Sequence, residues 1–200
     1  PAVARLAREL FGPSLVGLRL LSAIAQAVAV VVAALMVRDL GGGRLAQVVA
    51  GVAVAIAPMS AFSSATFMYV SFDFVWWVTV AWLVIRLLKS EDPRWWVPIG
   101  VVIGLGMMTR YTMAYWVVGL VAGVLLTGAR RYLRSRWLWA GVAVSLLVFL
   151  PNLVWQLRHD FITLQFLGSI HERDIGEGRT ANFLVDQFLV AANVFTIPLW

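Results

Sequence analysis

The sequence predicts an all-α protein: a multi-pass transmembrane helical bundle of about seven spans, with an interfacial amphipathic helix at its N-terminus. Hydrophobic residues fill 62% of the 200 positions, above the roughly 45–50% typical of soluble domains. Apolar runs follow one another, and most cations fall in the short stretches between them, as topology determinants do. The chain has no cysteine, which excludes disulfides and thiolate metal sites.

Residues 1–12 are expected to form the interfacial helix. Apolar positions follow helical spacing and charged positions fall on the other side: Val3, Leu6, Ala7 and Leu10 against Arg5, Arg8 and Glu9. Such a helix lies in the membrane plane with its apolar face buried. The alternative is a frayed terminus, since the chain begins with Pro1 rather than Met and ends within an apolar run. We expect residues 1–200 to be an internal piece of a single transmembrane domain.

Seven apolar runs are long enough to be considered spans. They cover residues 15–37, 45–61, 74–89, 95–109, 112–128, 137–155 and 183–200. Six of them lie within 15–155, and the seventh is cut off at the chain end. The fourth and fifth are shorter than the usual length of about 20 residues, so they are expected to tilt or to meet at a cavity. The polar segment 156–182 is expected to be an outer loop.

The orientation follows from the distribution of cations. The loops after the first, third and fifth spans hold nine of them: Arg38, Arg44, Arg86, Lys89, Arg94, Arg130, Arg131, Arg134 and Arg136. The short loops on the other side, 62–73 and 109–112, hold only Arg110. Because cytoplasmic loops are enriched in Lys and Arg, the nine-cation side is predicted to be cytoplasmic. Asp73, Arg110 and segment 156–182 then face outward together.

Arg110 lies between two apolar runs. A lone cation at bilayer depth costs about 2.5–3.5 kcal/mol on insertion scales, so a retained one is a functional candidate. Its donor fork suits a phosphate group. The alternative is an arginine that snorkels to the headgroups. Tyr111 beside it either adds a hydroxyl donor or anchors the interface.

Asp73 opens the third apolar run. One interpretation is an N-terminal helix cap, where carboxylates are favoured. The other is a carboxylate at the mouth of an outward cavity. There it would hydrogen-bond an acceptor hydroxyl, hold a divalent metal, or pair with a cation.

The two histidines, His159 and His171, are candidate contacts of the outer loop. They lie twelve residues apart, which matches no helical zinc-ligand spacing. The metal ligands are therefore left unknown, and a divalent metal is left open as a cofactor. His159 beside Asp160 is only a weak candidate for a general-base pair, because adjacent side chains need not face each other. Mixed charges in this segment are also explained by solvation.

Short motifs recur in one order along the chain: FGPSL with LRLLSA at 11–15 and 18–23, LGG at 40–42, AP at 57–58, Asp73, GLGMMTRY at 104–111, and LPNLVWQ at 150–156. Together they resemble the membrane glycosyltransferases of the GT-C superfamily, in the branch related to protein O-mannosyltransferases and the lipid A aminoarabinose transferase. Arg110 stands where this branch usually has lysine. Pro1 is similar to the second proline of the family's Pro-Pro-Leu element. The family's principal catalytic acid is therefore expected upstream of residue 1.

The resemblance implies transfer of a sugar from a polyprenyl-phosphate donor to a lipid, glycan or protein acceptor. The active site would face out of the plasma (inner) membrane, surrounded by membrane lipid, with no nucleic-acid partner. Asp73 would orient the acceptor or a metal, and Arg110 with Tyr111 would bind the lipid phosphate. Residues 1–200 alone are expected to be inactive. The alternatives are a transporter or flippase for anionic lipid-linked substrates, and a non-catalytic subunit in which Asp73 and Arg110 merely pair.

Overall fold

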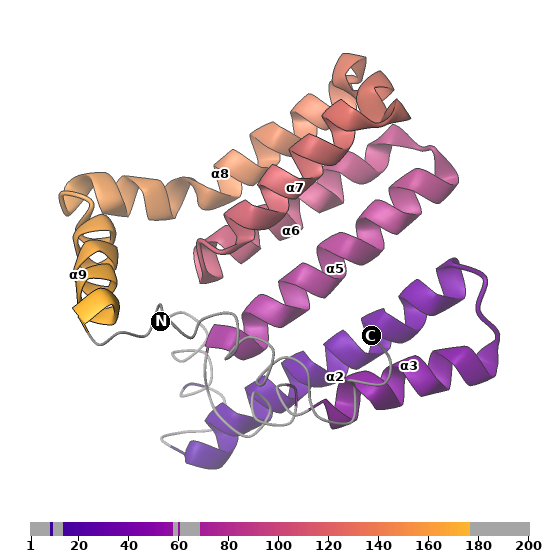
Figure 1. Cartoon of the computed structure of the whole chain (residues 1–200), viewed down its shortest axis with the longest axis horizontal. Coiled ribbons are helices and arrows are strands. Elements are labelled where there is room, and N and C mark those ends of the chain that lie inside the picture. Colours follow the sequence, from indigo (N-terminus) through magenta and orange to yellow (C-terminus); the bar gives the residue numbers. More distant parts are fainter. Residues whose placement is uncertain (1–8, 10–13, 58–59, 61–68, 177–200) are drawn as a thin grey trace. The chain divides into compact units, whose positions relative to one another are not determined.

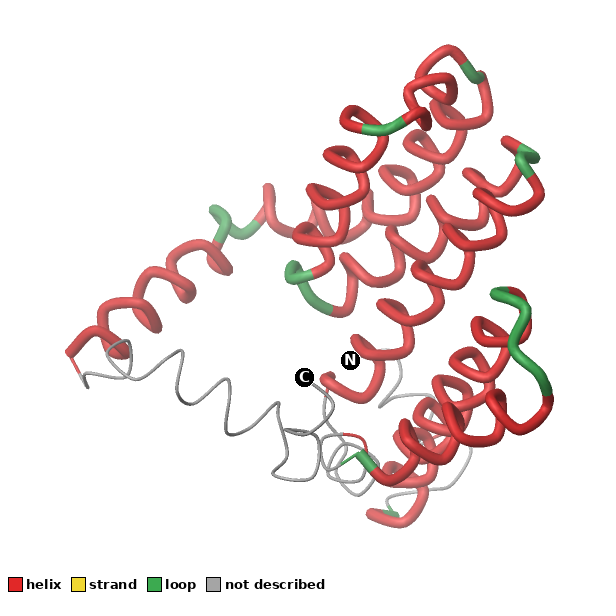
Figure 2. The backbone as a smooth tube through the Cα atoms, turned by 45° about the vertical axis from the view of Figure 1, so that its right-hand side comes forward, coloured by secondary structure: helices red, strands yellow, loops and turns green. Residues whose placement is uncertain are grey.

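The computed structural model describes residues 14–57 and 69–176, together with Glu9 and Ser60. Every regular element within these ranges is a helix, as Figures 1 and 2 show. The all-α prediction is therefore confirmed. The chain divides into two compact units, residues 1–150 and 151–200, and each is described by itself.

The described part of the first unit is built from helices. Its elements are α2 (Leu15–Asp39), α3 (Arg44–Ile56), α5 (Tyr69–Ser90), η1 (Pro93–Trp95), α6 (Trp96–Thr109), α7 (Met113–Leu126), η2 (Gly128–Arg134) and the first part of α8 (Arg136–Arg158). Helix α2 packs against α3 and α5, and α5 also contacts α6 and α7. Helix α5 is thus the central element of the unit.

Local chemistry sets the limits of α2. The side chain of Ser14 accepts a hydrogen bond from the Val16 N–H at 3.2 Å and caps the N-terminus, since Ser satisfies one of the unpaired amides there. At the other end Gly41 adopts a φ of 96°. This left-handed conformation favours glycine and reverses the chain into α3.

Glycines bring α6 and α8 into close contact. A Cβ atom on Gly100 would lie 2.0 Å from the Gly141 carbonyl oxygen, and one on Gly141 would lie 2.2 Å from the Trp96 carbonyl oxygen. Gly104, one turn further along α6, faces Ser145 and Val148 in the same way. Small residues at this spacing let helix backbones approach in membranes.

The expected number of spans is not confirmed. On length and composition, three of the described helices can cross a membrane, namely Arg19–Asp39, Tyr69–Ser90 and Arg136–Arg158. A fourth is added if α7 and η2, which are bent by 103°, count as one broken span. Helices α3, α6 and α7 have only 13, 14 and 14 residues, or about 20 Å of rise, against a hydrocarbon core of about 30 Å. The seventh expected span, 183–200, lies outside the described residues.

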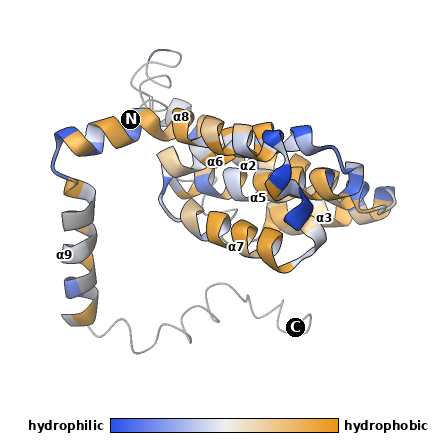
Figure 3. Cartoon of the chain, turned by 90° about the horizontal axis from the view of Figure 1, so that it is seen from above, coloured by the Kyte–Doolittle hydropathy of each residue, from blue (hydrophilic) through white to orange (hydrophobic). Residues whose placement is uncertain are grey.

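Extended backbone ends the short helices. Ala57 follows α3, Arg110 follows α6 and Thr127 follows α7, each with ψ between 130° and 177°. The ends of α6 and α7 agree to within two residues with the ends of the expected spans 95–109 and 112–128. Figure 3 shows α7 as largely hydrophobic.

The nine cations gather at one end of the first unit. In Figure 1 the turns after α2, α5 and α7 lie at the right-hand end of the helices, and the α6–α7 turn lies at the left-hand end. At the cationic end, Asp39 of α2 accepts hydrogen bonds from Trp82 Nε1 and Arg86 Nε of α5, both at 2.8 Å. The Arg86 guanidinium also lies over the rings of Trp82 and Trp95. This network ties α2 to α5.

Buried polar groups join the same two helices nearer their other end. Gln26 of α2 donates from Nε2 to the Ser71 carbonyl oxygen of α5 at 3.4 Å, and it accepts from Ser60 Oγ at 3.0 Å. All three side chains are buried. Satisfied polar groups of this kind fix the register of packed membrane helices.

The second unit holds the end of α8 and α9 (Ile162–Gly176). The segment 156–182, expected as a polar loop, is therefore helical over most of its described length. Its predicted outward location stays a prediction. The expected interfacial helix 1–12 lies outside the described residues except for Glu9.

Candidate functional site

The α6–α7 turn, residues 109–112, is fastened to the first turns of α5. Three contacts do this: Trp76 Nε1 donates to Thr109 Oγ1 at 3.0 Å, Thr112 Oγ1 donates to Asp73 Oδ2 at 3.1 Å, and the Arg110 guanidinium carbon lies 4.9 Å from the Tyr69 ring centroid. The site is thus assembled from two segments about 40 residues apart in sequence. It lies at the end of the bundle opposite the nine cations.

The spacing on α5 explains why these contacts form together. Tyr69, Asp73 and Trp76 occupy positions i, i+4 and i+7, which fall on one face of a helix. That face meets the turn between α6 and α7. The predicted proximity of Asp73 and Arg110 is therefore confirmed by geometry.

Asp73 is a buried carboxylate with one unused oxygen. Only 8% of the residue is exposed. Its Oδ2 accepts from Thr112, whereas Oδ1 has no hydrogen-bond partner among the described residues. Asp73 is the fifth residue of α5 as described, so the interpretation as an N-cap is wrong. A buried, unpaired oxygen is costly, and such an atom is suited to bind a substrate hydroxyl or a cation.

Arg110 is an exposed cation at the C-terminus of α6. Its backbone is extended, with φ −157° and ψ 139°, and its N–H donates to the Gly106 carbonyl at 2.8 Å. A helix C-terminus favours a positive charge. Its charge is close enough to interact with that of Asp73, yet no ion pair or side-chain hydrogen bond joins the guanidinium to any residue the structure describes. Its five N–H donors are therefore available for an anion.

Tyr111 anchors the turn to α8. Its ring meets the Phe149 ring edge to face, with centroids 6.2 Å apart and an interplanar angle of 88°. Aromatic pairs favour this arrangement. This ring contact does not test whether Tyr111 anchors the membrane interface or whether its hydroxyl contacts a phosphate, and both stay predictions.

Both histidines belong to the second unit. The His159 ring stacks on Trp155 with centroids 4.3 Å apart, and its Nδ1 lies 2.8 Å from the Trp155 carbonyl oxygen. Both contacts are made within one helical turn. His171 lies in α9. The predicted roles of His159 and His171 as contacts of the outer segment stay predictions.

No metal site is formed by the part of the chain that the structure describes. No group of three or more His, Asp or Glu side chains gathers there. Asp73 Oδ1 is a single ligand atom, and a hard divalent cation needs about six oxygen ligands. The described residues therefore do not form a metal site by themselves.

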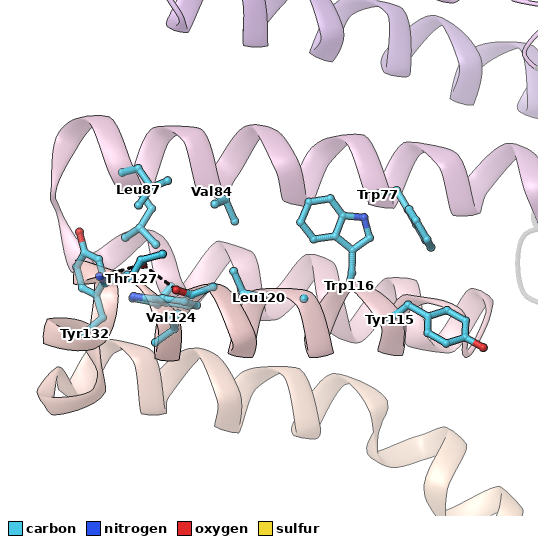
Figure 4. Close-up of a pocket in the computed structure, with 14 residues that line it drawn as sticks. Trp77, Val84, Leu87, Tyr115, Trp116, Leu120, Val124, Thr127 and Tyr132 are labelled. Carbon is cyan, nitrogen blue, oxygen red and sulfur yellow. Dashed lines mark hydrogen bonds between the residues drawn. The ribbon is translucent and has the colours of Figure 1, made fainter. Parts of the chain in front are cut away.

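An apolar groove lies between α5 and α7. It begins where Trp77 meets Trp116 edge to face, at 6.3 Å and 87°, one turn beyond Asp73. Its volume is about 440 Å³. In Figure 4, Val84 and Leu87 of α5 point toward Leu120 and Val124 of α7 across it.

Glycines on α7 keep this groove wide. A Cβ atom on Gly119 or Gly123 would meet nothing within 4 Å, in contrast to the glycines between α6 and α8. Glycines four residues apart therefore have two different effects: Gly100 and Gly104 let α6 pack closely against α8, whereas Gly119 and Gly123 leave open space beside α7.

These features define a multi-pass membrane protein with an anion-binding candidate site at one end of its bundle. Residues 1–155 match the family described as dolichyl-phosphate-mannose-protein mannosyltransferase, and the chain belongs to this family of GT-C membrane glycosyltransferases. The family predicted from the sequence motifs is thus confirmed.

One curated relative has a more specific name. The chain is 34% identical over 106 residues to lipid A galacturonosyltransferase RgtD of Rhizobium johnstonii. The match covers 51% of this chain and 22% of that protein, so less than a quarter of the relative's length is matched by this chain. No solved structure matches the chain.

Three site residues were missed in the sequence: Tyr69, Trp76 and Thr112. The signal that could have found the first two was their helical spacing from Asp73. Thr112 had a weaker signal, because a hydroxyl in an apolar chain is common at a turn. Only the folded structure shows that it faces the carboxylate.

Proposed function

We propose that this chain forms the donor-binding end of a glycosyltransferase. The enzyme moves a sugar from a polyprenyl-phosphate carrier to an acceptor on the outer face of the membrane. The observation that carries the proposal is Arg110, an exposed guanidinium without an anionic partner among the described residues, held within interaction range of a buried carboxylate.

Arg110 binds the carrier phosphate in this account. The phosphate is bound in the ground state and gains charge as the sugar–phosphate bond breaks. A preorganised cation at that position stabilises the transition state. The planar guanidinium can bind two phosphate oxygens through two parallel N–H bonds, a geometry that the ammonium group of lysine does not offer.

Asp73 orients the acceptor. Its Oδ2 is engaged by Thr112 and its Oδ1 is unused, so one oxygen is available to accept a hydrogen bond from an acceptor hydroxyl. The Thr112 contact fixes the direction of the carboxylate. Burial at 8% exposure strengthens such a bond, because the local dielectric constant is low.

The groove between α5 and α7 offers an apolar path for the carrier chain. It runs from Trp77 to Leu88 along α5, about 16 Å at 1.5 Å per residue. The end of the groove at Trp77 lies one helical turn of α5 from Asp73. A lipid with its phosphate at Arg110 could therefore lay the first part of its chain between these helices.

The outward orientation is supported by the nine cations at the other end of the bundle, which the positive-inside rule places in the cytoplasm. This gives an inner-membrane protein with its site facing away from the cytoplasm. The acceptor is then a lipid, glycan or protein on that face. The name of the relative favours a lipid A acceptor, and the family name favours a protein.

The test uses the full-length protein in nanodiscs. Radiolabelled mannose and galacturonic acid are each supplied either on polyprenyl phosphate or on a nucleotide, with lipid A or membrane protein extract as acceptor. The proposal expects label to move only from a polyprenyl-phosphate donor, with release of polyprenyl phosphate. Transfer from the nucleotide donor alone would contradict it. Movement of intact donor across a sealed bilayer without transfer would favour a flippase instead.

A further inference from the structure

Tyr69 is an exposed aromatic residue at the start of α5, with 51% of its surface accessible. The guanidinium of Arg110 lies over its ring, 4.9 Å from the centroid. This is within the range of about 6 Å at which a cation is attracted to the face of an aromatic ring. The contact crosses from α5 to the α6–α7 turn.

The ring is the contact that holds the guanidinium among the described residues. The Arg110 backbone is fixed by its bond to Gly106, but its side chain makes no ion pair or hydrogen bond within the described part of the chain. Without the ring, a long flexible side chain at the surface would sample many rotamers. Ordering it on substrate binding costs conformational entropy.

A contact through the ring face leaves the nitrogen donors unused. The N–H groups of a guanidinium lie in its plane and point outward from its edge. A ring partner attracts the cation without accepting those hydrogens in ordinary hydrogen bonds. The side chain can therefore be positioned and still offer two N–H groups to a phosphate.

The arginine at the other end of α5 shows the contrasting case. Arg86 also lies over aromatic rings, those of Trp82 and Trp95. However, its Nε donates to the Asp39 carboxylate at 2.8 Å, so its charge is already neutralised by a structural partner. Arg110 has the aromatic support without the carboxylate bond.

We propose that Tyr69 is a positioning residue for the donor phosphate site: its ring holds the Arg110 guanidinium ready to bind the phosphate of the lipid carrier. The inference rests on the proposed function of Arg110. It also gives a reason for arginine at this position, because a guanidinium is less strongly hydrated than an ammonium group and stacks better on an aromatic face.

The expected effect is modest and specific. Loss of an exposed cation–π contact, worth about 0.5–1 kcal/mol, corresponds to a change of roughly 2- to 5-fold. Tyr69→Leu should raise the KM for the polyprenyl-phosphate donor by about this factor, with kcat nearly unchanged, because the contact preorganises binding rather than the chemical step. Tyr69→Phe keeps the ring and should behave as wild type.

A matched control lies on the same helix. Phe74 is also exposed, at 38%, and follows Asp73 on a different face of α5. Phe74→Leu removes an aromatic ring without touching Arg110, so it should leave the donor KM unchanged. If Tyr69→Leu melts below the wild type, Tyr69→Met removes the ring with a flexible side chain and provides the same comparison.

The decisive measurement is a double-mutant cycle in the full-length protein in phosphatidylcholine nanodiscs. Binding of tritiated polyprenyl monophosphate is measured for wild type, Tyr69→Leu, Arg110→Ala and the double variant. We expect Tyr69→Leu to weaken binding about 2- to 5-fold in the presence of Arg110 and to have no effect in its absence. An effect of equal size in both backgrounds, or no effect in either, would overturn the positioning role.

Further arms separate this inference from the proposed function. If Arg110→Ala weakens binding but Tyr69→Leu does not, the phosphate site stands and the role of Tyr69 falls. If Arg110→Ala binds like wild type, or neutral polyprenol binds as well as its phosphate, the phosphate site itself falls. The last arm tests whether nanodiscs rich in phosphatidylglycerol, or inorganic phosphate at a similar concentration, displace all of the bound polyprenyl monophosphate. Full displacement would show that the site accepts any phosphate and would contradict both the proposed function and the role of Tyr69.

Discussion

Replacing Asp73 by asparagine should separate its chemical role from its structural role. The two side chains have nearly the same size, and the amide oxygen of the substituted side chain can still accept the Thr112 hydrogen bond that Asp73 accepts at 3.1 Å. The fold should therefore be kept. What is lost is the charge and one acceptor oxygen, Oδ1, which has no partner among the described residues.

The size of the effect follows from that oxygen. A hydrogen bond between an acceptor hydroxyl and a charged carboxylate contributes about 1.5–3 kcal/mol, or roughly 10- to 150-fold. Asp73→Asn should therefore reduce kcat/KM for the acceptor by about this factor. The assay is sugar transfer at subsaturating acceptor, with thermal unfolding followed by tryptophan fluorescence as a check of the fold.

A companion variant tests the support of the carboxylate. Thr112→Val keeps the shape but removes the hydroxyl donor to Asp73, leaving a buried carboxylate without a hydrogen-bond partner among the described residues. Removal of such a partner costs about 1–3 kcal/mol. It should lower both stability and turnover, whereas Thr112→Ser should restore them. Wild-type transfer by Asp73→Asn would refute the reasoning and leave only a packing role for this residue.

Three other predictions concern packing and topology. Gly100→Ala should destabilise the bundle by about 1–3 kcal/mol, since its Cβ would lie 2.0 Å from a carbonyl oxygen. Gly119→Ala should be neutral or slightly stabilising, because a Cβ there meets nothing within 4 Å. Equal melting temperatures of the two variants would contradict the packing of α6 against α8. Asp39→Ala should lower the melting temperature by removing an acceptor shared by two side chains, about 1–3 kcal/mol, and an unchanged melting curve would show that this network is dispensable. A single cysteine replacing Ser90 should be shielded from an impermeant thiol reagent in intact cells while one replacing Ser64 reacts; the reverse pattern would overturn the proposed orientation.

The location of the site could be predicted because charge decides which end of a helix faces which side. The distribution of cations alone predicted that Asp73 and Arg110 lie at the same end of the bundle. The contacts of Asp73 with Thr112 and of Arg110 with Tyr69 confirm their proximity. This reasoning needs only the order of the apolar runs and does not depend on where each helix begins.

The rotation of each helix could not be predicted in the same way. Helices α6 and α7 are apolar on all sides, so hydropathy does not tell which face meets α5. The pairing of Trp76 with Thr109 depends on that rotation. The start of α5 was also misplaced, because Tyr69 and Val70 precede the most apolar part of the run, and this error suggested a capping role for Asp73.

The number of spans stays a prediction for a related reason. Apolar composition shows that a segment is compatible with lipid, but not that its helix is continuous. Helices α3, α6 and α7 are apolar but have only 13, 14 and 14 residues. The polarity of 156–182 likewise predicted a loop, whereas much of this segment continues as helix in α9.

The central claim is that the end of the bundle with Arg110 binds the donor phosphate. Its most direct test compares Arg110→Ala, Arg110→Lys and Arg44→Ala for sugar transfer from a polyprenyl-phosphate donor at subsaturating concentration. Arg44 is an exposed arginine at the opposite end and serves as the control for loss of one positive charge. The account predicts a loss of about 10- to 150-fold for Arg110→Ala, partial retention for Arg110→Lys and wild-type rates for Arg44→Ala. Wild-type rates for Arg110→Ala, or an equal loss for Arg44→Ala, would contradict it.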